Sequence, residues 1–436
     1  MRAGIGIALA MLMGAGLARA DDRLRIHVEG GAGRDYQVAV QRFVAEEGEA
    51  ASLLERFDLE LNRALEFAGP VKVVDRRAFL DPIDTPAAWK GHVGCDNWRG
   101  IGADALMNGR LETRGSRLAV RFQIWDTVRC RMLGKVRRFE AASGAVELLA
   151  RRIADEVVRR FTGIRGVSST QIAYVSNRTG NKEIYVMEAQ GSNPRAVTNN
   201  SSINLFPSWS PDGDSLLYTS YRAGQPQVWR ISRGARTNGQ LLRDGIAKLR
   251  GVWGPDNAGI LLVIAQGATT DLLRIRENGS RAQRLTRARS LETSPSWSPD
   301  ASRVAFVSDR SGSPQLYILD LGTREVRRLT YRGSYNASPA WSPTDGRIVF
   351  QSQTGASFDL YLIDPDSGDT APLVVQAGSD EDPAWSPDGR KIVFASSRSG
   401  SYQLYSIDLD GQNLRQLTTQ QLGECTGPAW SPWLDE

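Results

Sequence analysis

The chain has 436 residues, of which 41% are hydrophobic and 24% charged, a composition typical of a folded protein with more than one domain. It contains only 2 His and 3 Cys, which excludes cysteine-rich zinc modules and any site that needs several histidine ligands. The formal net charge of +5 is small for this length and gives no strong field, so we expect no nucleic-acid partner.

Residues 1–20 have the features of a cleaved secretory signal. Arg2 precedes an apolar stretch from Ile5 to Leu17, and Ala18-Arg19-Ala20 matches an A-x-A cleavage site. The apolar stretch is too short to span a membrane. We therefore expect a periplasmic mature chain that begins at Asp21 and does not insert into the membrane; an uncleaved anchor is the alternative.

Residues 21–162 are predicted to form a small α/β domain, and residues 163–170 a linker. Strands are expected over 23–31, 36–44 and 71–74, followed by an antiparallel meander over 103–112, 117–126 and 132–140. Apolar residues at intervals of three or four predict amphipathic helices over 49–67 and 145–161. The basic run from Arg129 to Arg138 falls on a predicted strand, mostly as a solvated face, with a patch for an anionic partner as the alternative.

Residues 171–436 contain a repeat with a period of 44. Its clearest column consists of tryptophans at intervals of 44 and finally 45: Trp209, Trp253, Trp297, Trp341, Trp385 and Trp430. Most of these open the sequence W-S-P-D-G or a close variant, in which Pro, Asp and Gly favour a tight turn. The period fits four short strands, which is the size of one β-propeller blade. The sequence predicts six blades, with the repeated indoles packed between them.

The two ends of the repeat array predict how the ring closes. The first repeat begins at Ile172 without a tryptophan strand before it, whereas the strand around Trp430 has no strand after it. Placing the C-terminal strand in the first blade leaves no open sheet edge. The expected fold is therefore multidomain, with an N-terminal α/β domain followed by an all-β six-bladed propeller that the C-terminal strand closes.

The sequence lacks the motifs of common enzyme classes. It has no G-x-S-x-G elbow, no P-loop and no G-x-G-x-x-G fingerprint, and both histidines, His27 and His92, precede the propeller. The acidic cluster Asp380, Glu381 and Asp382 is expected to be a solvated loop, with a paired-carboxylate catalytic site as the alternative. We expect a binding protein without cofactor or metal; a cation in the channel is conceivable, but no ligand motif supports it.

The segments RIHVEGG and VAVQRF, the junction IADEVVRRFTGIRGVSSTQIAYVS and the terminal GPAWSPWL together resemble the TolB family of the Tol-Pal system. This resemblance implies a monomeric, non-enzymatic periplasmic adaptor. It would bind the lipoprotein Pal through the propeller mouth and TolA through its N-terminal region, and would contact the other Tol-Pal components indirectly. Its implied role is in outer-membrane invagination during cell division and in envelope integrity. The alternative is a periplasmic propeller enzyme or a peptidase-associated subunit with a glycosidase-like acidic site.

The resemblance also implies which residues bind each partner. The Pal contacts would come from the loops ahead of the tryptophan strands, namely Ala247, Arg250, Glu292, Thr293, Ser294, Asn336 and Asp380. The TolA contacts would come from an N-terminal arm, formed by Asp21, Asp22, Arg23, Leu24, Arg25 and Ile26. At the position of Ala247 the family has a histidine, so the details of Pal recognition would differ here.

The three cysteines are Cys95, Cys130 and Cys425. In an oxidising compartment Cys95 and Cys130, both in the first domain, could form a disulfide and leave Cys425 free. Sequence alone cannot place their Cα atoms at bonding distance, so the pairing stays open at this level.

Overall fold

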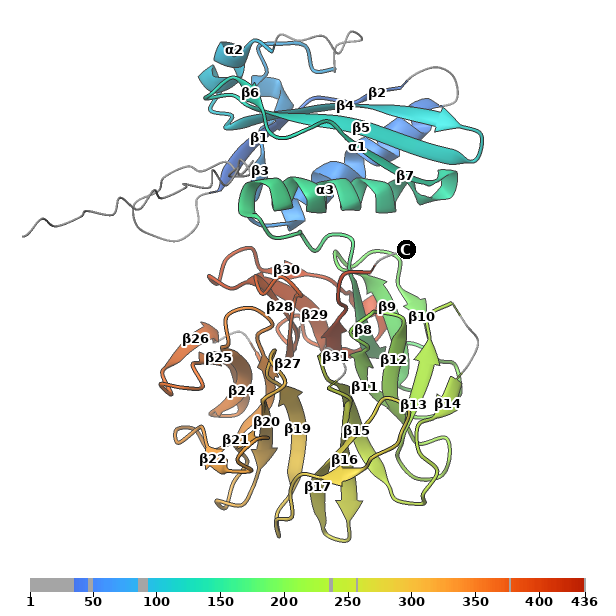
Figure 1. Cartoon of the computed structure of the whole chain (residues 1–436), viewed down its shortest axis with the longest axis vertical. Helices are drawn as coiled ribbons and strands as arrows, with labels where there is room; N and C mark the ends of the chain where they lie inside the picture. Colours follow the sequence, from blue (N-terminus) through green and yellow to red (C-terminus); the bar gives the residue numbers. More distant parts are fainter. Residues whose placement is uncertain are drawn as a thin grey trace, which may run out of the picture.

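The computed structural model describes residues 35–45, 50–84, 93–234, 238–255, 258–375 and 378–434. The signal segment, the strand predicted over 23–31, the N-terminal arm and both histidines lie outside these residues. Within them, an α/β domain packs against a ring of six four-stranded blades (Figure 1). The predicted fold class is confirmed. None of the helices in the described part of the chain has the length and apolar character that a membrane span requires.

The N-terminal domain is one mixed sheet with two long helices on one face (Figure 1). Its strands are β1 (Tyr36–Val40), β2 (Val44–Ala45), β3 (Val71–Val73), β4 (Ala105–Arg114), β5 (Arg117–Asp126), β6 (Arg131–Met132) and β7 (Arg137–Ala142). The order is β3-β1-β4-β5-β6, with β2 paired to β4 and β7 to β5. Helices α1 (Ala50–Phe67) and α3 (Val146–Thr162) bury their apolar stripes against the sheet, as the periodicity predicted.

A short helix, α2 (Cys95–Gly100), lies against the other face of this sheet and was not predicted from the sequence. Its Trp98 is 2% exposed and packs with Leu106 of β4. Cys95 of α2 forms a disulfide with Cys130, with their Cα atoms 5.7 Å apart, and Cys425 is a buried free thiol. Three single turns of 3-10 helix, η1 (Arg76–Ala78), η2 (Ser143–Ala145) and η3 (Gln420–Leu422), complete the helical elements of the described residues.

Each blade of the propeller is an antiparallel sheet whose innermost strand comes first in the sequence repeat. Blade 2 consists of β11 (Asn204–Trp209), β12 (Ser215–Ser220), β13 (Gln227–Ser232) and β14 (Asn238–Gln240). Blade 3 consists of β15 (Lys248–Trp253), β16 (Ile260–Gln266), β17 (Thr269–Ile275) and β18 (Gln283–Arg284). Blade 4 consists of β19 (Glu292–Trp297), β20 (Arg303–Ser308), β21 (Gln315–Asp320) and β22 (Val326–Arg328). Blade 5 consists of β23 (Asn336–Trp341), β24 (Ile348–Thr354), β25 (Ser357–Ile363) and β26 (Thr370–Val374). Blade 6 consists of β27 (Asp380–Trp385), β28 (Lys391–Ser396), β29 (Gln403–Asp408) and β30 (Arg415–Gln416).

Blade 1 is built from both ends of the propeller sequence. It contains β8 (Gln171–Ser176), β9 (Glu183–Glu188) and β10 (Arg195–Ala196), and its innermost strand is β31 (Cys425–Trp430). β31 pairs antiparallel with β8, with Trp430 opposite Ile172. Closure of the ring by the C-terminal strand is thus as the sequence predicted.

The two domains meet at blades 1 and 6. Arg151 of α3, which is 4% exposed, donates to Glu60 of α1 at 2.8 Å and lies 3.4 Å from Glu188 of β9. Asp155, also on α3, is fully buried and accepts hydrogen bonds from the backbone N–H groups of Ser168 (2.6 Å) and Ser169 (2.9 Å). Residues 163–170 are therefore held against α3 instead of forming a free connection.

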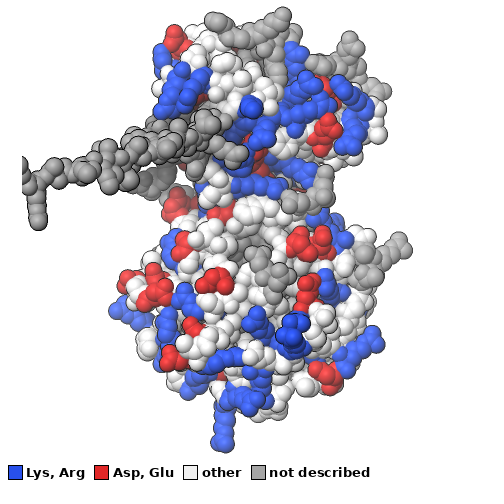
Figure 2. Space-filling model, viewed as in Figure 1, with Lys and Arg blue, Asp and Glu red and all other residues white. Residues whose placement is uncertain are grey.

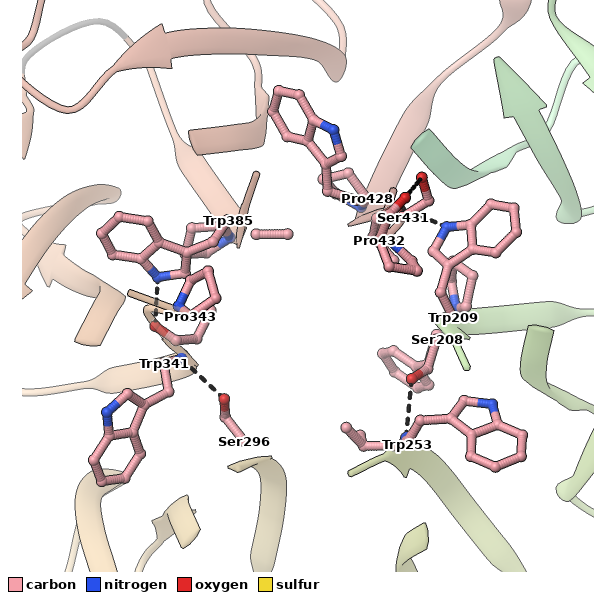
Figure 3. A pocket seen from close by; sticks show the side chains of 18 of the residues that line it. Ser208, Trp209, Trp253, Ser296, Trp341, Pro343, Trp385, Pro428, Ser431 and Pro432 are labelled. Carbon is pink, nitrogen blue, oxygen red and sulfur yellow. Dashed lines mark hydrogen bonds between the residues drawn. The ribbon is translucent and has the colours of Figure 1, made fainter. Parts of the chain in front are cut away.

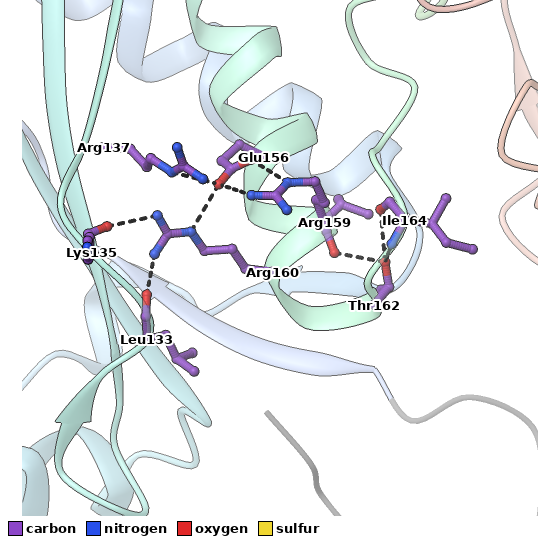
Figure 4. Close-up of polar contacts among 9 residues, drawn as sticks. Leu133, Lys135, Arg137, Glu156, Arg159, Arg160, Thr162 and Ile164 are labelled. Atoms are coloured by element: carbon purple, nitrogen blue, oxygen red, sulfur yellow. Dashed lines mark hydrogen bonds and ion pairs between the residues drawn. The ribbon is translucent and has the colours of Figure 1, made fainter. Parts of the chain in front are cut away.

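The basic run near Arg129–Arg138 is not one continuous strand face. Arg129 pairs with Asp126 in a turn, whereas Arg137, Arg159 and Arg160 surround Glu156 of α3 (Figure 4). Arg160 also donates to the carbonyl oxygens of Leu133 and Lys135, so it ties the end of α3 to the turn before β7. These pairings give the run a structural role in the N-terminal domain.

Candidate functional site

Every innermost strand has a β-bulge shortly before its tryptophan. The register with the second strand of the blade shifts at this point in β11, β15, β19, β23, β27 and β31. Phe206, Ser294, Ser338 and Asp382 adopt positive φ angles of 46–55° at the bulge, a conformation that costs energy for non-glycine residues. In five of the six innermost strands, the bulge brings one residue to the wall of the central channel.

These residues line a channel with a volume of about 440 Å³. Its wall contains Phe206, Arg250, Ser338, Asp382 and Gly427 from the bulges, together with prolines on both sides of the tryptophans. Figure 3 shows the proline rings at the wall of the channel and the indole rings directed away from it, between the blades. The channel surface is therefore formed by prolines and by a few polar side chains.

The tryptophans lie between blades and link them. Their exposed fractions are only 6–8%. Trp209 Nε1 donates to the carbonyl of Ala429 in blade 1 at 3.2 Å, and Trp385 Nε1 donates to the carbonyl of Ala340 in blade 5 at 2.8 Å (Figure 3). This position, away from the channel, fits a packing role.

Arg250 and Asp382 carry opposite charges on blades 3 and 6, which face each other across the six-membered ring. Arg250 lies over the Phe206 ring, 5.0 Å from its centroid, and donates to Ser294 Oγ at 3.3 Å. Asp382 accepts a hydrogen bond from Ser338 Oγ at 3.0 Å. Burial raises the pKa of Asp382, and the positive charge of Arg250 opposes that rise.

Three of the residues expected at the mouth are buried inside the blades. Glu292, Asn336 and Asp380, each the first residue of its innermost strand, are at most 1% exposed. Glu292 pairs with Arg310, Asn336 Nδ2 donates to Gln315 Oε1 of blade 4 at 2.8 Å, and Asp380 accepts from Arg398 Nη2 at 2.8 Å. Because the first strand position points into the protein, these three side chains are already partnered within the blades, and their part in binding stays a prediction.

The acidic cluster is likewise not a solvated loop. Asp380, Glu381 and Asp382 are the first three residues of β27, and their side chains have different surroundings. Asp380 pairs with Arg398, Glu381 accepts from the Tyr402 hydroxyl, and Asp382 faces the channel. The three carboxylates therefore do not converge on one point. No cluster of three or more metal-ligating side chains occurs among the residues that the structure describes.

The remaining predicted mouth residues, Ala247, Arg250, Thr293 and Ser294, are partly exposed. Around them is a set of exposed apolar side chains, which we call the rim: Ile203, Phe206, Ile246, Leu291, Tyr331 and Tyr335, with exposed fractions of 36–74%. The sequence reasoning missed the rim. The sequence contains a pattern that could have revealed it. In blades 2, 4 and 5 an apolar residue stands directly before the innermost strand, at a loop position that would normally be polar.

The rim lies at the end of the blades opposite to the N-terminal domain. Within each blade the chain enters the innermost strand at the rim and leaves it at the W-S-P-D-G turn. Lys391, the first residue of β28, and Asp408, the last of β29, are both at the turn end, where Lys391 lies over the Phe67 ring of α1. The described part of the N-terminal domain therefore leaves the rim uncovered.

A second repeated feature also escaped the sequence reasoning. The turn between the second and third strands carries an arginine in four blades, and its guanidinium lies over an aromatic ring of the third strand. The pairs are Arg178 with Tyr185, Arg222 with Trp229, Arg310 with Tyr317 and Arg398 with Tyr405, at 3.4–5.1 Å from the ring centroids. Two of these arginines also neutralise Glu292 and Asp380, so they stabilise the strands beneath the mouth.

Comparison with known proteins identifies the family. Residues 158–434, more than half of the chain, match the TolB beta propeller domain, and residues 24–133 match the TolB amino-terminal domain. Tol-Pal system protein TolB of Desulfosudis oleivorans is 38% identical over 157 residues, which cover 36% of this chain and 35% of that protein. The protein of the same name from Bordetella parapertussis is 34% identical over 219 residues, covering 49% and 47%. The chain thus spans about a third to a half of the length of these curated relatives.

The fold comparison covers more of the chain. The crystal structure of TolB from Acinetobacter baumannii superposes with a TM-score of 0.77 over 92% of this chain and 97% of that one, at 20% identity. At this identity the superposition shows a shared fold only, but it includes both the α/β domain and the propeller. Together with the family match over both domains, these findings show that the chain belongs to the TolB family.

Proposed function

We propose that this protein is a non-enzymatic periplasmic adaptor of the Tol-Pal system. Residues 1–20 would be a signal peptide. The mature protein would then consist of an N-terminal domain over 21–162, a linker over 163–170 and the propeller over 171–436. The propeller mouth binds Pal, and the N-terminal arm Asp21–Ile26 binds TolA. In this role the protein supports outer-membrane invagination in cell division and the integrity of the envelope. Its family membership and the names of its relatives support this proposal.

The exposed rim is the observation that best supports the proposed location of the Pal-binding site. Soluble proteins rarely leave several large apolar side chains exposed together unless a partner covers them. Leu291 is 46% exposed, and the Tyr335 ring lies in an edge contact with Phe358 that holds it at the surface. Aromatic side chains of this kind supply much of the binding energy in protein interfaces. We therefore place the rim at the centre of the proposed contact surface, with the buried Glu292, Asn336 and Asp380 beneath it.

The surroundings of the acidic cluster favour an adaptor over a glycosidase-like enzyme. A glycosidase needs two carboxyl groups that flank one bond of the substrate. Here Asp380 is completely buried and paired with Arg398, which leaves Asp382 as the carboxylate of the cluster that lines the channel. Turnover of an oligosaccharide or peptide by the purified protein, lost in Asp382→Asn, would favour the enzyme instead.

The Pal site can be tested with a matched pair of substitutions. Leu291→Glu places a charge in the rim, and Leu414→Glu places the same charge on an equally exposed leucine, 45% against 46%, in the turn after β29 at the other end of the blades. We expect Leu291→Glu to weaken capture of Pal by at least about tenfold, as for a central interface residue, and Leu414→Glu to leave it unchanged. Equal capture by both variants would contradict the rim as the Pal site.

The TolA site needs a separate experiment. Deletion of residues 21–26 from the mature chain should abolish binding to TolA and leave Pal binding intact, because the proposed Pal site consists of propeller residues alone. Full TolA binding by the truncated protein would contradict the assignment to the arm. A protein that binds neither partner in full-length form would contradict the adaptor role itself.

A further inference from the structure

The channel contains a cationic side chain, Arg250, that forms no ion pair with any residue in the described part of the chain. Arg250 makes one hydrogen bond, to Ser294 Oγ, and no carboxylate among the described residues lies within 4.0 Å of its guanidinium. A guanidinium has five N–H donors in a planar arrangement that suits a carboxylate. The guanidinium lies over the Phe206 ring, 5.0 Å from its centroid, and both side chains line the channel. Burial lowers the pKa of Arg250, as expected for a charge that lacks a full hydrogen-bond set.

The opposite wall contains an anionic side chain in a comparable position. Asp382 accepts a hydrogen bond from Ser338 Oγ at 3.0 Å, and its own backbone N–H donates to Gln351 Oε1 at 2.9 Å. These contacts fix the orientation of the carboxylate, but none of them comes from a cation. Arg250 and Asp382 influence each other electrostatically across the channel without touching. A ligand between them can therefore meet both charges at once.

We propose that this channel binds a small zwitterion of the α-amino acid or short-peptide class. The ligand carboxylate would take two donors of Arg250, and its ammonium group would donate to Asp382. A simple anion would be repelled by Asp382 and a simple cation by Arg250, so only a ligand with both charges gains at both walls. The apolar part would contact the prolines of the wall. The volume of about 440 Å³ is within the range of small-molecule sites.

Calorimetric titration of the purified full-length protein with three probes tests the charge requirement. L-alanyl-L-alanine has both charges, N-acetyl-L-alanyl-L-alanine lacks the ammonium, and L-alanyl-L-alanine amide lacks the carboxylate. We expect the free dipeptide to bind and each blocked form to bind at least about tenfold more weakly, the cost of one unpaired charge. No heat from the free dipeptide at millimolar concentration, or equal binding of all three, would overturn the proposal.

Substitutions then assign each charge to a side chain. The Arg250→Gln variant should bind the free dipeptide no more tightly than the native protein binds the dipeptide amide. The Asp382→Asn variant should bind it no more tightly than the native protein binds the N-acetyl form. Arg250→Lys should recover part of the affinity. Arg347→Gln is the matched control, because Arg347 is a partly exposed arginine that pairs with Asp345 and is absent from the channel lining. Unchanged dipeptide binding in a folded Arg250→Gln protein, verified by its circular dichroism and melting curve, would overturn the assignment.

Discussion

Trp430 and Thr170 are 260 positions apart in the sequence, and the indole Nε1 of Trp430 donates to Thr170 Oγ1 at 2.7 Å. Thr170 ends the segment that connects the two domains, so this bond joins the last strand of the chain to the domain junction. The Phe67 ring of α1 lies 6.4 Å from the same indole, and Trp433 Nε1 donates to the Gly166 carbonyl at 2.8 Å. The strand that closes the propeller therefore also anchors the N-terminal domain.

Loss of this strand should destabilise both domains. Removal of residues 424–436 leaves β8 as an open edge and removes the partners of Phe67 and Gly166. We expect a large fall in melting temperature, and for Trp430→Ala a fall of about 3–5 kcal/mol in the free energy of unfolding. Trp253→Ala, at the same 8% exposure within the ring, is the control that lacks a contact with the N-terminal domain. Melting of the truncated protein at the full-length temperature would refute the closure model.

The junction should become less stable as the pH rises from 4 to 6. Burial raises the pKa of Asp155 to about 6, despite its hydrogen bonds from Ser168 and Ser169, compared with about 3.9 in an unfolded chain. The folded state therefore binds the proton more strongly, and this stabilisation is complete below about pH 4 and lost as the pH rises through 6. The shift corresponds to about 3 kcal/mol.

The test for Asp155 compares the protein with Asp155→Asn, which keeps the size of the side chain but does not titrate. Denaturant unfolding of both proteins at pH 4 and pH 7 gives the difference in their free energies of unfolding at each pH. We expect this difference to change by about 3 kcal/mol, with the native protein relatively more stable at pH 4. A constant difference would show that Asp155 titrates normally.

Asp380→Ala should lower the free energy of unfolding, because the substitution leaves the charge of Arg398 without its partner. Arg398 is only 14% exposed, and breaking a buried ion pair from one side costs about 3–5 kcal/mol. The control is Asp345→Ala, which breaks the more exposed pair with Arg347 and should cost less than about 1 kcal/mol. Equal stability of the two variants in denaturant titrations would contradict a structural role for Asp380.

The disulfide between Cys95 and Cys130 should stabilise the N-terminal domain. It links residues 35 positions apart, for which loop closure predicts a contribution of about 3–4 kcal/mol. Reductant should therefore lower the unfolding midpoint of the native protein and have no effect on the double variant Cys95→Ser/Cys130→Ser. A variant with Cys425→Ser should still respond to reductant, since Cys425 is a free thiol. A midpoint unaffected by reductant in the native protein would argue against the bond.

Much of the architecture could be predicted from the sequence because it depends on local and periodic signals. The repeat of 44 established six blades, and the unmatched strands around Ile172 and Trp430 indicated closure of the ring. The helices over 50–67 and 146–162 followed from apolar residues at a spacing of three or four. Helix α2 was missed because it has only six residues, too few for a periodic pattern, and is held by Trp98 and the disulfide.

The candidate site depended on tertiary structure. The alternation of side chains along a strand normally tells which residues share a face, but the bulge before each tryptophan breaks it. For this reason Glu292, Asn336 and Asp380 are buried, whereas Asp382, two positions later, reaches the channel. The sequence by itself determined the fold, the family resemblance and the scarcity of catalytic groups. Only the folded ring decided which charges face each other, because Arg250 and Asp382 lie on opposite walls of a channel that exists only once all six blades have closed.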